Sequence, residues 1–342
     1  MINQTFYSCF SEQGEDVLPT GKVLSSLKDE VEPIVFLDSC ICLEIIKVVD
    51  YKKQAKNVNF AKIIALKEYA SKHQIEISPF FGLLELCLKD GKLDEDKLWD
   101  FHHRIDFFKK ISLKIFKTFK YDFAQNYIFF RPDTGWLVNP YKAIEPTLRN
   151  SYCALLKIRC LAKKGLTREM AEKNISVFLE WMKTDLDIVR AVEYKLALNI
   201  FGGNSVYRKM IGLDCKPNEV IKRLVGTTWD IFHSNTTSNS FRLFKMLDRN
   251  FLPYFLTSDA NLFNIFKNFK LCVIKDGGDV YTSSFLRNSD FLVPHFAPDF
   301  IDRQNEKMMD CFIERGVNNY KYDKQKVDDL IRKLEIENDI QI

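Results

Sequence analysis

The chain has 342 residues, of which 46% are hydrophobic and 28% are charged, a composition that is typical of a globular protein and argues against long disordered stretches. Its formal net charge is only +4, so the total charge does not indicate a nucleic-acid-binding protein. No apolar run reaches the roughly 18 residues of a membrane span, and we therefore expect no membrane partner.

Nine cysteines are present, and none of them forms a CxxC pair, which argues against a structural zinc site. Most lie inside apolar runs, where we expect them to pack as small hydrophobic side chains. The first residues, MINQTFYSCF, lack the basic and apolar regions of a secretory signal peptide. These features predict a cytoplasmic protein with reduced thiols.

The predicted elements of the first half follow a polar lead-in over residues 1–30. They are a strand over 32–39, a buried helix directly after it, a helix over 59–74, a short strand and a helix over 75–92, and an almost continuous helical stretch over 93–185. The helices are predicted from the spacing of apolar residues along one face.

The second half begins with two predicted helices and then alternates between strands and helices. The elements are helices over 186–203 and 217–236, a strand over 251–259, a helix over 260–269, strands over 270–276 and 289–296, and helices near 299–315 and 322–337. Alternating strands and helices favour an α/β fold with a parallel sheet. We expect residues 31–92 and 186–298 to form its core, 93–185 a helical insertion, and 299–342 a helical C-terminal part.

Two aspartates end the two most convincing strands. IVFL leads into Asp38, YFLT leads into Asp259 after a single serine, and a predicted helix follows each of them. In open α/β sheets the carboxyl ends of the strands form the ligand-binding edge, so neighbouring parallel strands would bring these carboxylates together. Two close carboxylates favour a cation, and oxygen ligands suit Mg²⁺ or Mn²⁺. The alternative is that each aspartate only caps its helix.

Three further acidic residues are candidates for the same site. Glu85 is the only charge in the apolar run FFGLLELCL, where an unpaired carboxylate is costly to bury, although a half-exposed position beside Lys89 also explains it. Asp230, in GTTWDIFHS, lies on a small, polar helix stripe that suits either a cleft or solvent. Glu193 has basic neighbours, and a surface ion pair explains it without a site.

These acidic segments resemble the signature of PIN-like nucleases, in VFLDSC, a mid-chain glutamate, TTWDIFHS and FLTSDANL. The resemblance covers roughly residues 31–92 and 186–298. It implies a central parallel sheet flanked by helices and cleavage of phosphodiester bonds, usually in RNA, with a divalent metal. It assigns Asp38, Asp230 and Asp259 as metal ligands and Glu85, rather than Glu193, as the fourth acidic residue. The family often carries Asn two residues after the first Asp, where this chain has Cys40.

A basic segment, FFKKISLKIFKTFK over 107–120, is a candidate nucleic-acid surface. On one helix, Phe108, Ile111, Ile115 and Phe119 would form one face, with four lysines roughly opposite: Lys110, Lys114, Lys117 and Lys120. Each phosphate that a lysine neutralises adds salt-sensitive affinity. The alternative is a solvated helix face.

The predicted function is therefore a ribonuclease that depends on Mg²⁺ or Mn²⁺, with RNA favoured over DNA as its partner. A toxin or antiphage effector fits this kind of nuclease by fold-level analogy. Two alternatives stay open, a non-catalytic PIN-like scaffold that binds RNA or protein, and a helical interaction protein whose aspartates are only caps. A protein partner or a homo-oligomer is compatible with all of them.

Overall fold

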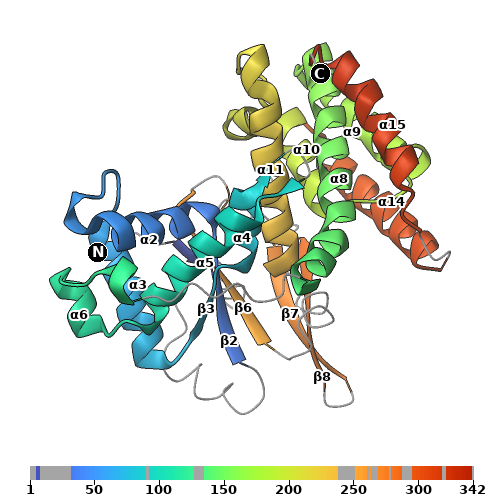
Figure 1. Cartoon of the computed structure of the whole chain (residues 1–342). Coiled ribbons are helices and arrows are strands. Elements are labelled where there is room, and N and C mark those ends of the chain that lie inside the picture. Colours follow the sequence, from blue (N-terminus) through green and yellow to red (C-terminus); the bar gives the residue numbers. More distant parts are fainter. Residues whose placement is uncertain are drawn as a thin grey trace. The chain divides into compact units, whose positions relative to one another are not determined.

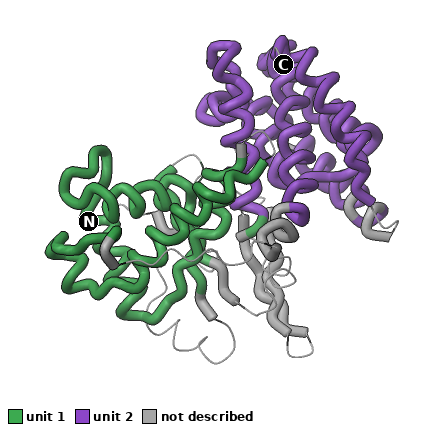
Figure 2. Tube along the Cα trace, viewed as in Figure 1, with its two compact units in different colours: residues 1–139, 236–285 green, residues 140–235, 286–342 purple. Residues whose placement is uncertain are grey.

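The structure is a computed structural model that describes residues 5–7, 32–89, 92–126, 135–237, 251–259, 262, 269–276, 279–286, 295–317 and 321–340. The chain forms two compact units (Figure 2). The first contains residues 1–139 and 236–285, and the second contains residues 140–235 and 286–342. Most described residues are helical, and the first unit also contains a small parallel sheet, so the fold is mixed α/β.

The sheet of the first unit has four strands in the order β1-β6-β2-β3. Their bounds are Thr5–Tyr7 for β1, Phe251–Thr257 for β6, Glu32–Leu37 for β2 and Glu76–Ser78 for β3. Strand β2 is parallel to both β3 and β6, whereas β1 is antiparallel to β6. The prediction that the strands before Asp38 and Asp259 are adjacent and parallel is therefore confirmed.

Strand β2 forms the centre of this sheet because its side chains are apolar on both faces. Ile34, Val35, Phe36 and Leu37 are all almost fully buried. A strand that is buried on both faces is typical of a parallel sheet with helices packed against it. Helices α2 and α4 pack against the sheet, and α5 packs against both of them (Figure 1).

Apart from β7 and β8, which are described below, the remaining elements of the first unit are helices and the strand pair β4-β5. They are α2 (Ser39–Tyr51), the 3₁₀ helix η1 (Lys52–Gln54), α3 (Phe60–His73), α4 (Phe80–Cys87), β4 (Leu88–Lys89), β5 (Lys92–Leu93), α5 (Glu95–Lys110), α6 (Leu113–Thr118) and α7 (Phe123–Asn126). The predicted helices near 39–52 and 59–74 and the strand–helix pair after residue 75 are confirmed.

One expectation about the later strands changes, and two other predicted elements fall largely outside the described residues. The predicted strand over 270–276 is present as β7 (Phe269–Asp276), but it pairs with β8 (Asp279–Leu286) in a separate two-stranded sheet and does not extend the parallel one. The strand predicted over 289–296 lies mostly outside the described residues, and His295 and Phe296 form a turn. The predicted helix over 260–269 also lies largely outside them, with only Leu262 and Phe269 described.

The second unit is built from helices joined by short connections. Its helices are α8 (Gly135–Lys164, which begins in the first unit), α9 (Arg168–Thr184), α10 (Ala191–Phe201), η2 (Ser205–Ile211), α11 (Pro217–Thr237), α14 (Pro298–Val317) and α15 (Lys324–Glu337). None of the helices in the described part of the chain is long and apolar enough to cross a membrane. The two predicted C-terminal helices are confirmed.

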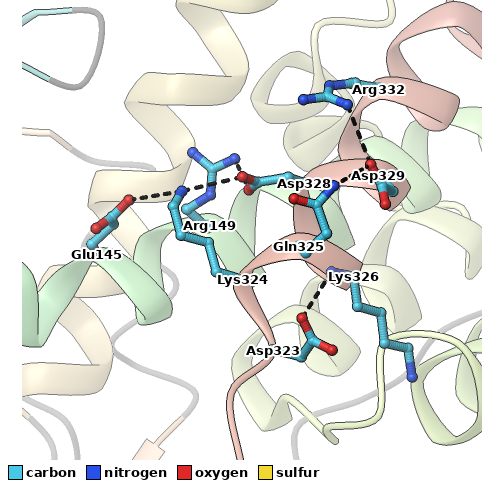
Figure 3. A network of polar contacts seen from close by, with 9 residues as sticks. All are labelled: Glu145, Arg149, Asp323, Lys324, Gln325, Lys326, Asp328, Asp329 and Arg332. Carbon is cyan, nitrogen blue, oxygen red and sulfur yellow. Dashed lines mark hydrogen bonds and ion pairs between the residues drawn. The ribbon is translucent and has the colours of Figure 1, made fainter.

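Helix α15 is held against α8 by charged and polar side chains (Figure 3). Arg149 of α8 forms an ion pair with Asp328 of α15, and Lys324 lies between Asp328, at 3.1 Å, and Glu145, at 3.4 Å. At the other end of α15, the side-chain amide of Asn338 donates to the carbonyl of Leu156 at 3.1 Å. The C-terminal helix is therefore an integral part of the second unit.

Seven cysteines lie among the described residues, and all of them are free. Five are buried in the two cores, namely Cys42, Cys87, Cys153, Cys160 and Cys311. Burial raises the pKa of the Cys153 thiol to about 12 and that of Cys160 to about 11. The prediction that these residues pack as small hydrophobic side chains is confirmed for the described part of the chain.

Candidate metal centre

Asp38 follows the last residue of β2 and continues the sheet by one backbone bond. Its N–H donates to the carbonyl of Leu256 in β6 at 3.0 Å. Asp38 occupies the N-cap position of α2, but its side chain makes no capping hydrogen bond. The carboxylate is instead buried, with only 6% of the residue exposed. Helix capping therefore does not explain why an aspartate occupies position 38.

Two donors hold the Asp38 carboxylate by one of its oxygens. The Thr257 hydroxyl, at the end of β6, donates to Oδ2 at 2.5 Å, and the Cys40 thiol donates to the same oxygen at 3.0 Å. Burial, together with the nearby Asp38 charge, raises the pKa of the Cys40 thiol to about 12, which keeps it a protonated donor. The other oxygen, Oδ1, receives a long bond of 3.4 Å from the Ser39 hydroxyl. These bonds fix the orientation of the Asp38 carboxylate.

Glu85 lies on α4, and a glycine one turn earlier allows this helix to approach Asp38. A Cβ atom on Gly82 would lie 2.6 Å from the carbonyl oxygen of Leu37, 2.9 Å from Sγ of Cys42 and 3.0 Å from the carbonyl carbon of Asp38. No real Cβ fits at such distances, so only glycine permits this packing. Gly82 thus places α4 directly against the carboxyl end of β2.

Asp38 and Glu85 are brought together by this packing. A carboxylate oxygen of each lies within 4.8 Å of the other, and Glu85 is half-buried. Two carboxylates this close repel each other in water-poor surroundings unless a cation or a proton lies between them. Carboxylate oxygens are ligands that divalent cations accept, so these two residues could hold a metal ion.

Asp259 caps the residues that follow β6. Its Oδ1 accepts a hydrogen bond from the backbone N–H of Leu262 at 3.2 Å, the pattern of an N-cap, and its own N–H donates to the Thr257 hydroxyl at 2.9 Å. The residue is exposed. The cap interpretation of Asp259 therefore has direct structural support, and Asp259 is also linked through Thr257 to Asp38.

The other two acidic candidates lie in the second unit. Asp230 is half-buried on α11, whose neighbouring residues Thr227 and His233 are buried. Glu193 on α10 is fully buried, and its Oε1 accepts hydrogen bonds from Arg190 at 3.0 Å and from the Ser151 hydroxyl at 2.5 Å. The expectation of a surface ion pair at Glu193 is therefore wrong, because the pair is in the core.

The lysines predicted to form one helical stripe lie on two helices and a turn. Helix α5 ends at Lys110, and Ser112 caps the start of α6, so residues 107–120 do not form one continuous helix. The spacing predicts Ile115 on the apolar face, but Ile115 is 46% exposed and its neighbour Phe116 is fully buried. Lys110 pairs with Asp106 at 2.7 Å, and Lys117 pairs with Glu68. Lys114 and Lys120 are exposed.

Sequence reasoning did not identify Thr257 or Gly82. The register of β2 and β6, which pairs Leu37 with Leu256, places Thr257 beside Asp38, and this signal becomes available once the strands are known to be adjacent.

No family model, curated protein or solved structure matches this chain. The site is therefore defined by the positions and chemistry of its own residues.

Proposed function

We propose that this protein is a metal-dependent nuclease that hydrolyses phosphodiester bonds, with RNA as the favoured substrate. The observation that carries the proposal is the approach of the Asp38 and Glu85 carboxylates to within 4.8 Å at the carboxyl edge of a parallel sheet. That edge is where α/β folds bind ligands. The PIN-like resemblance of the surrounding segments supports the same chemistry.

Asp38 and Glu85 are the proposed ligands of Mg²⁺ or Mn²⁺ within the first unit. A bound divalent cation supplies an activated water and stabilises the charge that develops on the scissile phosphate. Thr257 and Cys40 donate to Oδ2 of Asp38 and so orient the carboxylate that would hold the cation. Asp259 is retained as a further acidic residue of the proposed site, as the resemblance implies. Asp230, which the resemblance also assigns, lies on α11 in the second unit.

Asp38→Asn and Glu85→Gln test the proposed ligands. Each variant keeps the shape of the side chain and removes one of two neighbouring negative charges, so the metal-free protein is expected to stay folded and to melt at a slightly higher temperature. Cleavage of a labelled single-stranded RNA in Mn²⁺ is expected to fall by more than about 100-fold, because even outer partners of a metal contribute 10–100-fold.

The control for this experiment is Glu180→Gln, an exposed glutamate on α9 in the second unit. It removes the same charge from the chain and should leave both Mn²⁺ affinity, measured by calorimetry, and cleavage unchanged. A folded Asp38→Asn protein that binds and cleaves like the unmodified protein removes Asp38 from the site and the nuclease proposal with it.

Asp259→Asn separates the cap from a charge-dependent role. Asn caps a helix as well as Asp does, so we expect no change in thermal stability, whereas Asp259→Ala should cost about 1 kcal/mol. Cleavage by Asp259→Asn is expected to fall because a negative charge is lost beside Thr257 and Asp38. If the Asn variant retains full activity, Asp259 is only a cap and leaves the proposed site.

A non-catalytic PIN-like scaffold is the second candidate. It is favoured by Cys40, whose thiol contacts the Asp38 carboxylate at 3.0 Å where the family often has Asn. A scaffold of this kind binds RNA without Mn²⁺ and does not cleave it. The same cleavage assay therefore distinguishes the two candidates, and a role as a toxin or antiphage effector follows only from the catalytic one.

A further inference from the structure

Two basic segments of the first unit are joined by aromatic contacts. The ammonium group of Lys53, in η1, lies 5.5 Å from the ring centroid of Phe119, and that of Lys52 lies 5.5 Å from the ring centroid of Tyr121. The Tyr121 hydroxyl donates to the carbonyl of Val48 at 2.9 Å. The end of α2 and the chain that follows α6 are therefore held side by side.

Both segments are turns in which the backbone leaves the helical conformation. Lys52, at the end of α2, has a φ of 52°, and Phe119, at the end of α6, has a φ of 58°. A left-handed residue stops a helix at that point. Lys53 and Lys56 follow Lys52, and Lys120 follows Phe119, whereas Lys114 and Lys117 lie on α6 itself. These lysines therefore do not share the single helix face that the spacing predicts.

Lysines are concentrated at these two turns, and few of them are neutralised by acidic side chains. Six lysines come from them and from α6, namely Lys52, Lys53, Lys56, Lys114, Lys117 and Lys120. Lys117 is paired with Glu68, whereas the other five form no ion pair with any residue in the described ranges. Lys110 is separate from this group, because it is paired with Asp106.

An exposed aromatic side chain adjoins these lysines. Tyr51 immediately precedes Lys52 and is 60% exposed, which is unusual for a large aromatic residue. Unpaired bases of a single strand stack on exposed aromatic rings while lysines contact the phosphates on either side. A duplex keeps its bases stacked inside and gains nothing from such a ring.

We infer that Tyr51, Lys52, Lys53, Lys56, Lys114 and Lys120 form a binding surface for single-stranded RNA, here called the basic surface. Its lysines contact backbone phosphates and Tyr51 stacks on a base. This inference names the substrate class of the proposed nuclease and rests on that proposal for its biological role. The binding itself needs no metal and no catalytic residue.

Fluorescence anisotropy with labelled oligouridine of about 12 nucleotides, a length within known single-strand site sizes, tests the basic surface. Binding is measured in EDTA over a range of KCl concentrations. The double variant Lys53→Gln/Lys56→Gln is expected to bind more weakly and to reduce the slope of log affinity against log salt by about 1.4, or about 0.7 for each phosphate that a lysine no longer neutralises. Tyr51→Ala should weaken binding about tenfold, whereas Tyr51→Phe should not.

The matched control is Lys72→Gln/Lys92→Gln, which removes two exposed positive charges of the same unit outside the basic surface. Its salt slope should equal that of the unmodified protein. An equal decrease of slope in both double variants, or tighter binding to duplex RNA or to phosphatidylserine vesicles than to oligouridine, overturns the inference. Oligodeoxyuridine in the same assay compares DNA with RNA, and tighter binding to it overturns the assignment of RNA.

The test of the basic surface and the test of the nuclease proposal can fail independently of each other. Mn²⁺-dependent cleavage with an unchanged salt slope in Lys53→Gln/Lys56→Gln contradicts the basic surface and leaves the nuclease proposal intact. Binding in EDTA that depends on Tyr51 and these lysines, with no cleavage in Mn²⁺, supports the basic surface and contradicts the nuclease proposal.

Discussion

Replacement of Glu193 by alanine is expected to lower the free energy of unfolding of the second unit by about 3–5 kcal/mol, because it leaves Arg190 buried without its counter-ion. Arg190 is only 8% exposed and donates to Glu193 and to Ser151, at 3.0 Å and 2.8 Å. Urea denaturation followed by circular dichroism measures the loss.

Two companion variants show whether the effect arises from the ion pair. Glu193→Gln keeps an acceptor for Arg190 and should lose less stability than alanine. The double variant Arg190→Leu/Glu193→Leu removes both charges and should recover much of the stability, as buried pairs often do when apolar groups replace them. A double variant as unstable as Glu193→Ala contradicts this account.

The same variants decide which glutamate completes the acidic site. Because Glu193 already bonds to Arg190 and Ser151 within the core of the second unit, Glu193→Gln should leave Mn²⁺ affinity unchanged. Glu85→Gln should weaken it. The opposite pattern, with Mn²⁺ affinity lost only in Glu193→Gln, assigns the fourth acidic residue to Glu193.

Gly82→Ala is expected to destabilise the first unit by about 2 kcal/mol, since inserting a methyl group into a packed interface costs 1–3 kcal/mol. The new Cβ would meet the carbonyl of Leu37 at 2.6 Å, so α4 must move away from the end of β2. This movement carries Glu85 away from Asp38, and Mn²⁺ affinity should fall together with stability. Calorimetry and chemical denaturation measure the two effects.

Gly226→Ala provides the matched control, because a Cβ at Gly226 has no neighbour within 4 Å. Gly226 lies inside α11, where alanine should increase stability by about 0.5–1 kcal/mol through its higher helix propensity. If Gly82→Ala behaves like Gly226→Ala and retains full Mn²⁺ affinity, the close approach of α4 does not position Glu85.

The strand pair that carries Asp38 was predictable because its signal is local and strong. Apolar runs that are buried on both faces indicate parallel strands, and both runs end in short polar segments. The sequence also favours Glu85 over Glu193, because Glu85 follows a predicted strand, and the structure places Glu85 near Asp38 and Glu193 in the second unit. The register that places Thr257 against Asp38 could not be predicted from the sequence, because pairing between distant segments depends on tertiary packing.

The differences between prediction and structure have specific physical causes. The spacing of apolar residues over 107–120 matches one helix, but Ser112 offers an N-cap and its side chain accepts from the N–H of Ile115, which starts α6 separately. Strand β7 has the composition of a core strand, yet it pairs with β8, its neighbour in sequence. At Gly82 the requirement is an absent side chain, which leaves no periodic pattern.

The pairing of β2 with β6 also determines when the Asp38 carboxylate gains its hydrogen bond from Thr257 during synthesis. Thr257, which holds Asp38, follows it by 219 residues along the chain. At about 5–20 residues per second, a ribosome needs roughly 10–40 seconds to cover that distance. Residues 140–235 of the second unit emerge first, while β2 still lacks its central neighbour. The Asp38 carboxylate of the nascent chain therefore becomes ordered only after residue 257 has been made and β6 has paired with β2.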